Sequence, residues 1–190
     1  MKHGISHTLA LIGLGMATFA VTPVHAQTAA NGPYYATPSW DQQLPASTRF
    51  VVLSNWVDAN FPSGGAAVLD RETGLVWERS PQTDPFTWSA ARTVCNNSAT
   101  GGRRAWRLPW LHELGTLVDP KHGFPGPFLP AGHPFTNVQN AVYFSATADA
   151  EHSDIAGAAD FSDGEAGLFA FKTSKFNVWC VRGVSSEPIY

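Results

Sequence analysis

Residues that could perform acid–base or metal chemistry are few and widely spaced along this chain. His112 and Glu113 stand side by side, as in a zinc-protease helix, but Thr116 occupies the position where a second histidine would share the helix face. The sequence has no Gly-x-Ser-x-Gly motif to present a nucleophilic serine and no glycine-rich phosphate loop. Three other histidines stand at no metal-ligand spacing: His122, His133 and His152. We therefore expect no catalytic residue, no metal site and no cofactor.

Six carboxylates gather between residues 149 and 165, without a lysine or arginine among them. They are Asp149, Glu151, Asp154, Asp160, Asp163 and Glu165. Ca²⁺ prefers several oxygen ligands on a flexible loop, yet this stretch lacks the alternating spacing of a calcium loop. We interpret it as a solvated acidic loop with a turn at Asp163 and Gly164. A hydrolase that uses a carboxylate pair such as Asp160 and Asp163 is an alternative hypothesis.

Cationic side chains could support a different activity, the binding of an acidic ligand. Arginine forks match the oxygen atoms of sulfate and carboxylate groups. Arg107 is expected to pair with a buried acid, Glu113 or Asp70, instead of a ligand. Four cations are left open between a ligand face and ordinary solvated charge: Arg103, Arg104, Lys172 and Lys175.

Aromatic residues are interleaved with the loops in the second half of the chain. They are Trp110, Phe124, Phe128, Phe135 and Tyr143. Such rings stack on the C–H faces of sugars, although loop aromatics of a small domain also fill satellite cores. Four tryptophans are assigned to the core: Trp77, Trp88, Trp106 and Trp179. We predict that Trp110 and Tyr143 join the four cations in binding a ligand.

The composition fits one packed domain. The chain has 190 residues, of which 44% are hydrophobic and 14% are charged, and its formal net charge is -3. These values exclude a disordered chain, a coiled coil and a collagen-like rod. The slight excess of acid also argues against nucleic acid as the main partner.

The N-terminal residues have the pattern of a secretory signal peptide. Lys2 precedes a short apolar run, and the segment ends in Val24-His25-Ala26, a small-x-small exit. A membrane anchor is the other interpretation, but the run is too short to span a bilayer. We expect a signal peptide at 1–26, a linker or N-terminal arm at 27–47 and a domain at 48–186. The mature protein would then be periplasmic or extracellular, without a membrane span.

Cys95 and Cys180 are the only cysteines of the chain. Exported proteins fold where thiols oxidise, so a structural disulfide is the expected outcome. A reactive cysteine with a histidine base is the alternative, but Cys180 sits in a β-like run that offers no such base.

Helices and strands alternate irregularly in the predicted domain. A strand is expected at 49–53 and a hairpin at 66–78, whose turn runs from Asp70 to Gly74. One helix is predicted from Trp88 to Asn96 with Thr87 as its N-cap. A second is predicted to open at Pro109 and to extend to Val118. An irregular region follows, and further strands are predicted at 142–145, 168–171 and 178–181.

Several of these segments, taken in order, resemble one bacterial domain family. They are Val68-Leu69-Asp70-Arg71-Glu72-Thr73-Gly74-Leu75-Val76-Trp77, Thr87-Trp88-Ser89-Ala90-Ala91 leading to Cys95, Gly101-Gly102 with Trp106-Arg107-Leu108-Pro109, Glu113-Leu114, Tyr143-Phe144-Ser145-Ala146-Thr147 and Cys180-Val181-Arg182-Gly183. The set resembles the C-terminal domain of the Legionella collagen-like adhesin, a C-type-lectin-like family, over residues 49–184.

The resemblance implies an α+β, C-type-lectin-like fold. Its first and last strands would pair, two helices would flank small antiparallel sheets, and a long irregular loop region would form the ligand face. It also implies a disulfide from the first helix to the last strand, in agreement with Cys95 and Cys180. Trp110 departs from the family, which commonly has threonine there, and this departure is why we expect Trp110 to reach a ligand. The calcium-binding triplets of classical C-type lectins are absent.

The best-known members of the family are surface or secreted adhesins that recognise sulfated glycans. The resulting hypothesis is an exported, non-catalytic domain that binds carbohydrate or another cell-surface ligand. An alternative is a structural or assembly role in an envelope complex, with a partner protein docking on the arm that carries Tyr34, Tyr35 and Trp40. The hydrolase described above is the second alternative.

Overall fold

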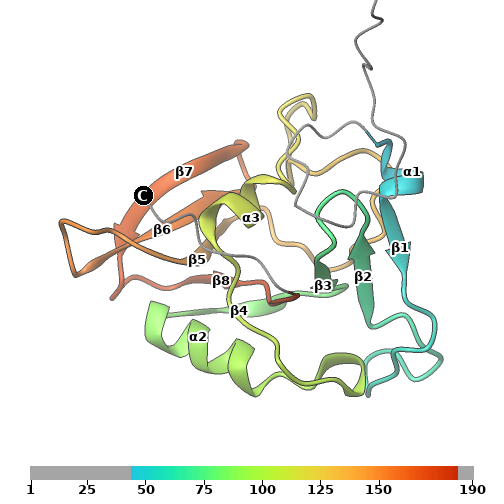
Figure 1. Cartoon of the computed structure of the whole chain (residues 1–190). Helices are drawn as coiled ribbons and strands as arrows, with labels where there is room; N and C mark the ends of the chain where they lie inside the picture. The colour runs from blue at the N-terminus through green and yellow to red at the C-terminus, as the bar shows by residue number, and fades with distance from the viewer. Residues whose placement is uncertain (1–43, 184–190) are drawn as a thin grey trace, which may run out of the picture. The chain divides into compact units, whose positions relative to one another are not determined.

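Residues 44–183 are described by the computed structural model, in which two β-sheets combine with a few short helices (Figure 1). The predicted α+β class is confirmed. The predicted signal peptide and most of the predicted arm lie outside the described residues. The boundary predicted at residue 48 falls inside a short helix, α1 (Ala46–Arg49), whose Ala46 is buried. Ala46, at the end of the predicted arm, therefore belongs to the packed part of the chain.

The first sheet has four strands in the order β1-β2-β3-β9. Their bounds are β1 (Phe50–Val52), β2 (Ala67–Asp70), β3 (Val76–Glu78) and β9 (Val181–Arg182). The predicted hairpin is confirmed as β2 and β3, whose turn places Gly74 at a φ of 71°. The expected pairing of the first and last strands is wrong. Because the hairpin lies between them, β1 and β9 form opposite edges of the sheet.

The second sheet has five strands in the order β4-β8-β5-β6-β7. Their bounds are β4 (Gln82–Phe86), β5 (Val142–Ala148), β6 (Ile155–Asp160), β7 (Glu165–Phe171) and β8 (Phe176–Val178). All neighbours are antiparallel except β5 and β8. The strand predicted at 178–181 is two strands, because the chain leaves one sheet at Val178 and enters the other at Val181.

The acidic stretch is not one continuous loop, contrary to the sequence-based interpretation, because a strand interrupts it. Its central residues form β6, and Ala156, Ala158 and Ala159 are fully buried. The predicted turn is present, since Gly164 donates a backbone hydrogen bond to the Asp160 carbonyl at 3.0 Å and has a φ of 84°. The carboxylates therefore stand at the two ends of a buried strand and not along one mobile segment.

The two predicted helices are present as α2 (Trp88–Asn97) and α3 (Leu111–Gly115). Thr87 occupies the N-cap position of α2, although its side chain makes no capping hydrogen bond. The second helix is shorter than predicted. Pro109 lies outside it, because the Pro109 carbonyl accepts the Ala146 N–H at 2.6 Å, beside β5. A 3₁₀ turn, η1 (Thr100–Gly102), follows α2.

Buried aromatic rings and one buried cation join the layers. Trp179 packs edge-on or tilted against four rings of the first core cluster: Trp77, Phe135, Tyr143 and Phe161. Arg49, which is 1% exposed, donates to both carboxylate oxygens of Asp70 at 2.9 and 2.7 Å and lies 3.2 Å from Glu72. Arg49 thus ties α1 to the β2–β3 hairpin.

The predicted disulfide is present. Cys95 in α2 is bonded to Cys180, which lies between β8 and β9, and the two residues are 85 positions apart in sequence. Both are fully buried in the second core cluster. The bond fixes α2 at the point where the chain passes from the second sheet to the first. No helix among residues 44–183 is long and apolar enough to cross a membrane.

Candidate functional site

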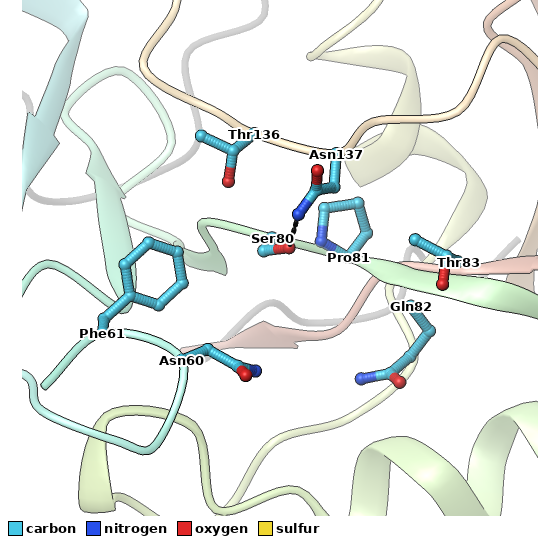
Figure 2. A pocket seen from close by; sticks show the side chains of 8 residues that line it. All are labelled: Asn60, Phe61, Ser80, Pro81, Gln82, Thr83, Thr136 and Asn137. Atoms are coloured by element: carbon cyan, nitrogen blue, oxygen red, sulfur yellow. Dashed lines mark hydrogen bonds between the residues drawn. The ribbon is translucent and has the colours of Figure 1, made fainter.

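A pocket of about 490 Å³ lies where three distant segments of the chain meet. Its lining is almost entirely amide and hydroxyl in character, with one aromatic ring (Figure 2). The lining residues are Asn60, Phe61, Ser80, Pro81, Gln82, Thr83, Thr136 and Asn137. None of them carries a formal charge.

One wall comes from the loop between β1 and β2, and Asp58 holds that loop in place. One Asp58 carboxylate oxygen accepts the N–H groups of Asn60 and Phe61 at 2.9 and 3.0 Å, and the other accepts the Gly101 N–H at 3.0 Å. The same carboxylate therefore shapes the wall and attaches it to η1.

The floor is the segment from Ser80 to Thr83, which leads from β3 into β4. Asn177 of β8 supports it, because its side-chain amide donates to the carbonyls of Gln82 and Thr83 at 3.4 and 3.2 Å. A register shift in β4 after Gln82 separates this segment from the regular sheet.

The third wall is the end of the long irregular region. Thr136 donates its N–H to the Arg79 carbonyl at 2.8 Å, and the Asn137 side chain donates to the Ser80 hydroxyl at 3.0 Å. Asn137 adopts a φ of 55°, a left-handed conformation that asparagine tolerates better than most residues. Backbone and side-chain bonds thus fix this wall to the floor.

Several polar groups of the lining are available to a ligand. Figure 2 shows the carboxamides of Asn60 and Gln82 pointing toward each other across the pocket. Neither carboxamide hydrogen-bonds to another residue of the described chain, and the same holds for the hydroxyls of Thr83 and Thr136. Amides and hydroxyls that both donate and accept suit a neutral polyhydroxylated ligand, and the Phe61 ring supplies an apolar face.

The predicted cations do not line this pocket; two of them belong to a group around Trp56. The guanidinium groups of Arg103 and Arg182 lie 5.4 and 5.6 Å from the Trp56 ring centre. Arg182 also donates to the backbone carbonyl of Arg104 at 2.9 Å. Arg103 and Arg104 are exposed, so this group forms a basic surface at the turn after α2.

Lys172 belongs to a second group, around Trp88. Its ammonium lies 4.5 Å from the Trp88 ring centre, and the Arg92 guanidinium lies 4.8 Å from it. Lys172 also donates to the Ser153 carbonyl at 2.6 Å, while Lys175 is exposed beyond it. Trp88 is only half-buried, unlike the other three tryptophans assigned to the core, which are buried as expected.

The two predicted aromatic ligand residues lie in different environments. Tyr143 is fully buried in the core, its hydroxyl accepts the Gln139 N–H at 2.7 Å, and burial raises its pKa to about 12. Its ring is therefore not on a surface where a ligand could stack, and Tyr143 is removed from the candidate binding residues. Trp110 is half-buried at the N-cap of α3. Neither Trp110 nor Tyr143 belongs to the groups that the predicted cations form around Trp56 and Trp88.

Arg107 has the structural role that the sequence suggested. It makes a bidentate pair with Glu113, with both nitrogen–oxygen distances at 2.7 Å. The Glu113 side chain also accepts the Trp110 N–H at 2.8 Å and so caps α3. The other acid considered, Asp70, pairs with Arg49 instead.

Three of the six acidic residues in the stretch 149–165 accept hydrogen bonds from nearby residues. Asp149 accepts the N–H groups of His152 and Glu151, which lowers its pKa, and Asp160 accepts both the N–H and the hydroxyl of Ser162. Asp163 accepts the Glu165 N–H at 3.0 Å. Within residues 44–183, no group of three histidine, cysteine or acidic side chains is arranged to hold a metal ion.

Sequence reasoning named none of the eight pocket residues as ligand residues. Only Thr136 and Asn137 lie in the irregular region that was expected to form the ligand face. The signal that could have drawn attention to the floor is the polar run Ser80-Pro81-Gln82-Thr83 directly after a buried strand. The assembly of the three segments depends on tertiary contacts that no local pattern specifies.

Comparison with known proteins assigns the chain to a family. No curated protein matches it significantly. The profile of the Lcl C-terminal domain matches residues 66–182, which is more than half of the chain. The matched range includes the β2–β3 hairpin, both disulfide cysteines and six of the eight pocket residues, and it leaves out Asn60 and Phe61 of the first wall. The chain belongs to the Lcl C-terminal domain family.

Proposed function

We propose that this protein is an exported, non-catalytic recognition domain with a C-type-lectin-like fold that binds the neutral part of a carbohydrate in the polar pocket. The observation that carries the proposal is the lining itself, which has one aromatic ring and no charge. Four of its polar side chains have no hydrogen-bond partner among residues 44–183, namely those of Asn60, Gln82, Thr83 and Thr136. Sugars present alternating hydroxyl donors and acceptors with apolar C–H faces, and this lining complements both.

Two further observations support the proposal. The family is named for an adhesin domain, which fits a role in adhesion. The buried disulfide fits folding in an oxidising compartment, since such bonds form in secreted and periplasmic proteins. The disulfide joins α2 to the segment between β8 and β9, and this link is consistent with a C-type-lectin-like architecture.

The test is a glycan array with the full chain, expressed for export and purified as the host processes it. Wild-type protein should bind a defined set of glycans equally well with and without EDTA. Gln82→Ala and Asn60→Ala should each weaken binding about fivefold, because each removes a ligand hydrogen bond worth roughly 1 kcal/mol.

Asn96→Ala is the matched control, since Asn96 is an exposed carboxamide on α2, outside the pocket lining. It should bind as wild type does. Arg103→Ala distinguishes the basic surface from the pocket. If glycan binding survives Gln82→Ala but is lost in Arg103→Ala, the pocket is not the binding site. The absence of binding to any glycan contradicts the proposal as a whole.

A further inference from the structure

The four edge strands of the two sheets differ in how well they are protected against pairing with another chain. In the first sheet, β1 has three residues, and β9 has two and is itself flanked by an antiparallel bridge between Arg107 and Val181. In the second sheet, the edge strand β4 contains Asp84 and Pro85 and an irregular register. Short strands, proline, charge and bulges are the devices that prevent edge-to-edge association. The edge strand β7 is seven residues long and has no proline, and its register shift against β6 lies near its start, between the pairs made by Glu165 and Leu168.

The outer half of β7 is apolar and exposed. Phe169 and Phe171 are 55% and 58% exposed, and they alternate with Ala170, so both lie on one face of the strand. Their partners on β6 are Gly157 and Ile155, and Gly157 contributes no side chain of its own beside the Phe169 ring. Figure 1 shows β7, in orange, at the outer side of the second sheet.

The backbone of the same segment faces outward. Lys172 donates its N–H to the Asp154 carbonyl on the β6 side at 2.8 Å. Because backbone groups alternate sides along an antiparallel strand, those of Phe169 and Phe171 point away from β6. The Phe171 carbonyl accepts the Ser174 N–H, which leaves the Phe169 N–H and C=O and the Phe171 N–H directed to the free edge.

Charge along β7 is polarised. Exposed Asp163 and Glu165 stand at its start, and Lys172 and exposed Lys175 follow its end. We propose that β7 is a self-association edge, through which two copies of this chain pair antiparallel about a two-fold axis. This arrangement sets the acidic start of each strand beside the basic end of the other and lets the exposed phenylalanines of both copies pack together. A parallel pairing would oppose like charges.

The first test is the association state of the full chain, purified as above, by sedimentation equilibrium over a wide concentration range. Wild type should show a monomer–dimer equilibrium. Phe169→Lys should raise the dimer dissociation constant about tenfold or more, because each lost cross-strand contact occurs twice in a symmetric dimer. Val57→Lys is the control, since Val57 is another exposed apolar residue, 47% exposed, and lies in the loop between β1 and β2.

A charge swap tests the antiparallel direction. Glu165→Lys and Lys175→Glu should each weaken the dimer, and the double variant Glu165→Lys/Lys175→Glu should restore it. Circular dichroism and thermal melting verify that every variant keeps the fold. A wild-type chain that stays monomeric at all concentrations, or a dimer that Phe169→Lys leaves unchanged, overturns the proposal. A double variant no tighter than the single ones overturns the antiparallel arrangement. All these outcomes are independent of glycan binding.

Discussion

At the scale of single residues, Glu78 is buried next to the disulfide, and its described partners are neutral. Its carboxylate accepts hydrogen bonds from the hydroxyls of Ser98 and Thr100 at 2.8 and 2.7 Å and lies 3.4 Å from the Cys180 N–H. Burial raises the pKa of Glu78 above its ordinary value of 4.5, the hydrogen bonds oppose that shift, and the nearby Asp58 charge adds to it. Glu78 therefore joins β3 to the segment after α2 while its charged form is disfavoured.

The pH dependence of the free energy of unfolding should report the raised pKa of Glu78. Because its pKa is higher in the folded state, Glu78 contributes most stability when protonated, and this contribution is lost as pH rises from about 4.5 through the folded-state pKa. Glu78→Gln has no such titration. The free energy of unfolding of the variant minus that of wild type should increase over this pH range and then level off. Urea unfolding at successive pH values measures the difference, and a decrease with rising pH would contradict it.

Residue roles could be predicted from sequence where a partner lies nearby in the chain. Arg107 and Glu113 are six positions apart, and their pairing was expected. Tyr143 could not be distinguished from an exposed aromatic residue, because its burial depends on Phe161 and Trp179, which are brought to it by other strands. Burial is a tertiary property, and an aromatic type alone does not specify it.

At the scale of elements, α3 is capped both by Glu113 of its own first turn and by a residue from a distant strand. Trp110 at its N-cap has no side-chain oxygen to accept a hydrogen bond from the first turn. Thr147, from β5, accepts the Leu111 N–H on its hydroxyl at 2.9 Å. A residue 36 positions away thus accepts one of the backbone N–H groups in the first turn of α3, which have no partner within the helix.

Removal of this cap should destabilise the protein measurably. Thr147→Val keeps the shape and strand preference of the side chain but removes the hydroxyl, and we expect a loss of about 1 kcal/mol in the free energy of unfolding. Thr93→Val is the matched control, since the exposed Thr93 hydroxyl donates only to the Ser89 carbonyl within α2. Its effect should stay within about 0.5 kcal/mol. Chemical denaturation of both variants decides the matter, and equal effects would show that Thr147 does not cap α3.

The helices and the first hairpin were predictable because their signals are local. Apolar spacing indicated α2, and the glycine turn indicated the β2–β3 hairpin. The strand β6 was missed because Ile-Ala-Gly-Ala-Ala-Asp has almost no β-branched or aromatic residue. Its small side chains are needed by their surroundings: a Cβ on Gly157 would lie 3.0 Å from both Leu111 and the Ser145 hydroxyl. Packing against other elements, rather than propensity, makes this segment a strand.

At the scale of the whole molecule, the disulfide is the covalent link between α2 and the last strands. It closes a loop of 85 residues, so chain-entropy arguments assign it about 4 to 5 kcal/mol of stabilisation. We expect the Cys95→Ala/Cys180→Ala variant to lose several kcal/mol in the free energy of unfolding, with the two lost sulfur atoms adding a small packing cost. Urea unfolding of this variant and of oxidised wild type gives the comparison. A difference below about 1 kcal/mol would contradict the assigned role.

The last two strands have a consequence for biosynthesis. β8 lies between β4 and β5 in one sheet, and β9 pairs with β3 in the other, so residues 176–182 complete both. A nascent chain that has not yet released this segment from the ribosome lacks a central strand of one sheet and an edge strand of the other. Neither sheet can therefore reach its native strand order until residues 176–182 have been synthesised, so both sheets depend on the same late event in folding.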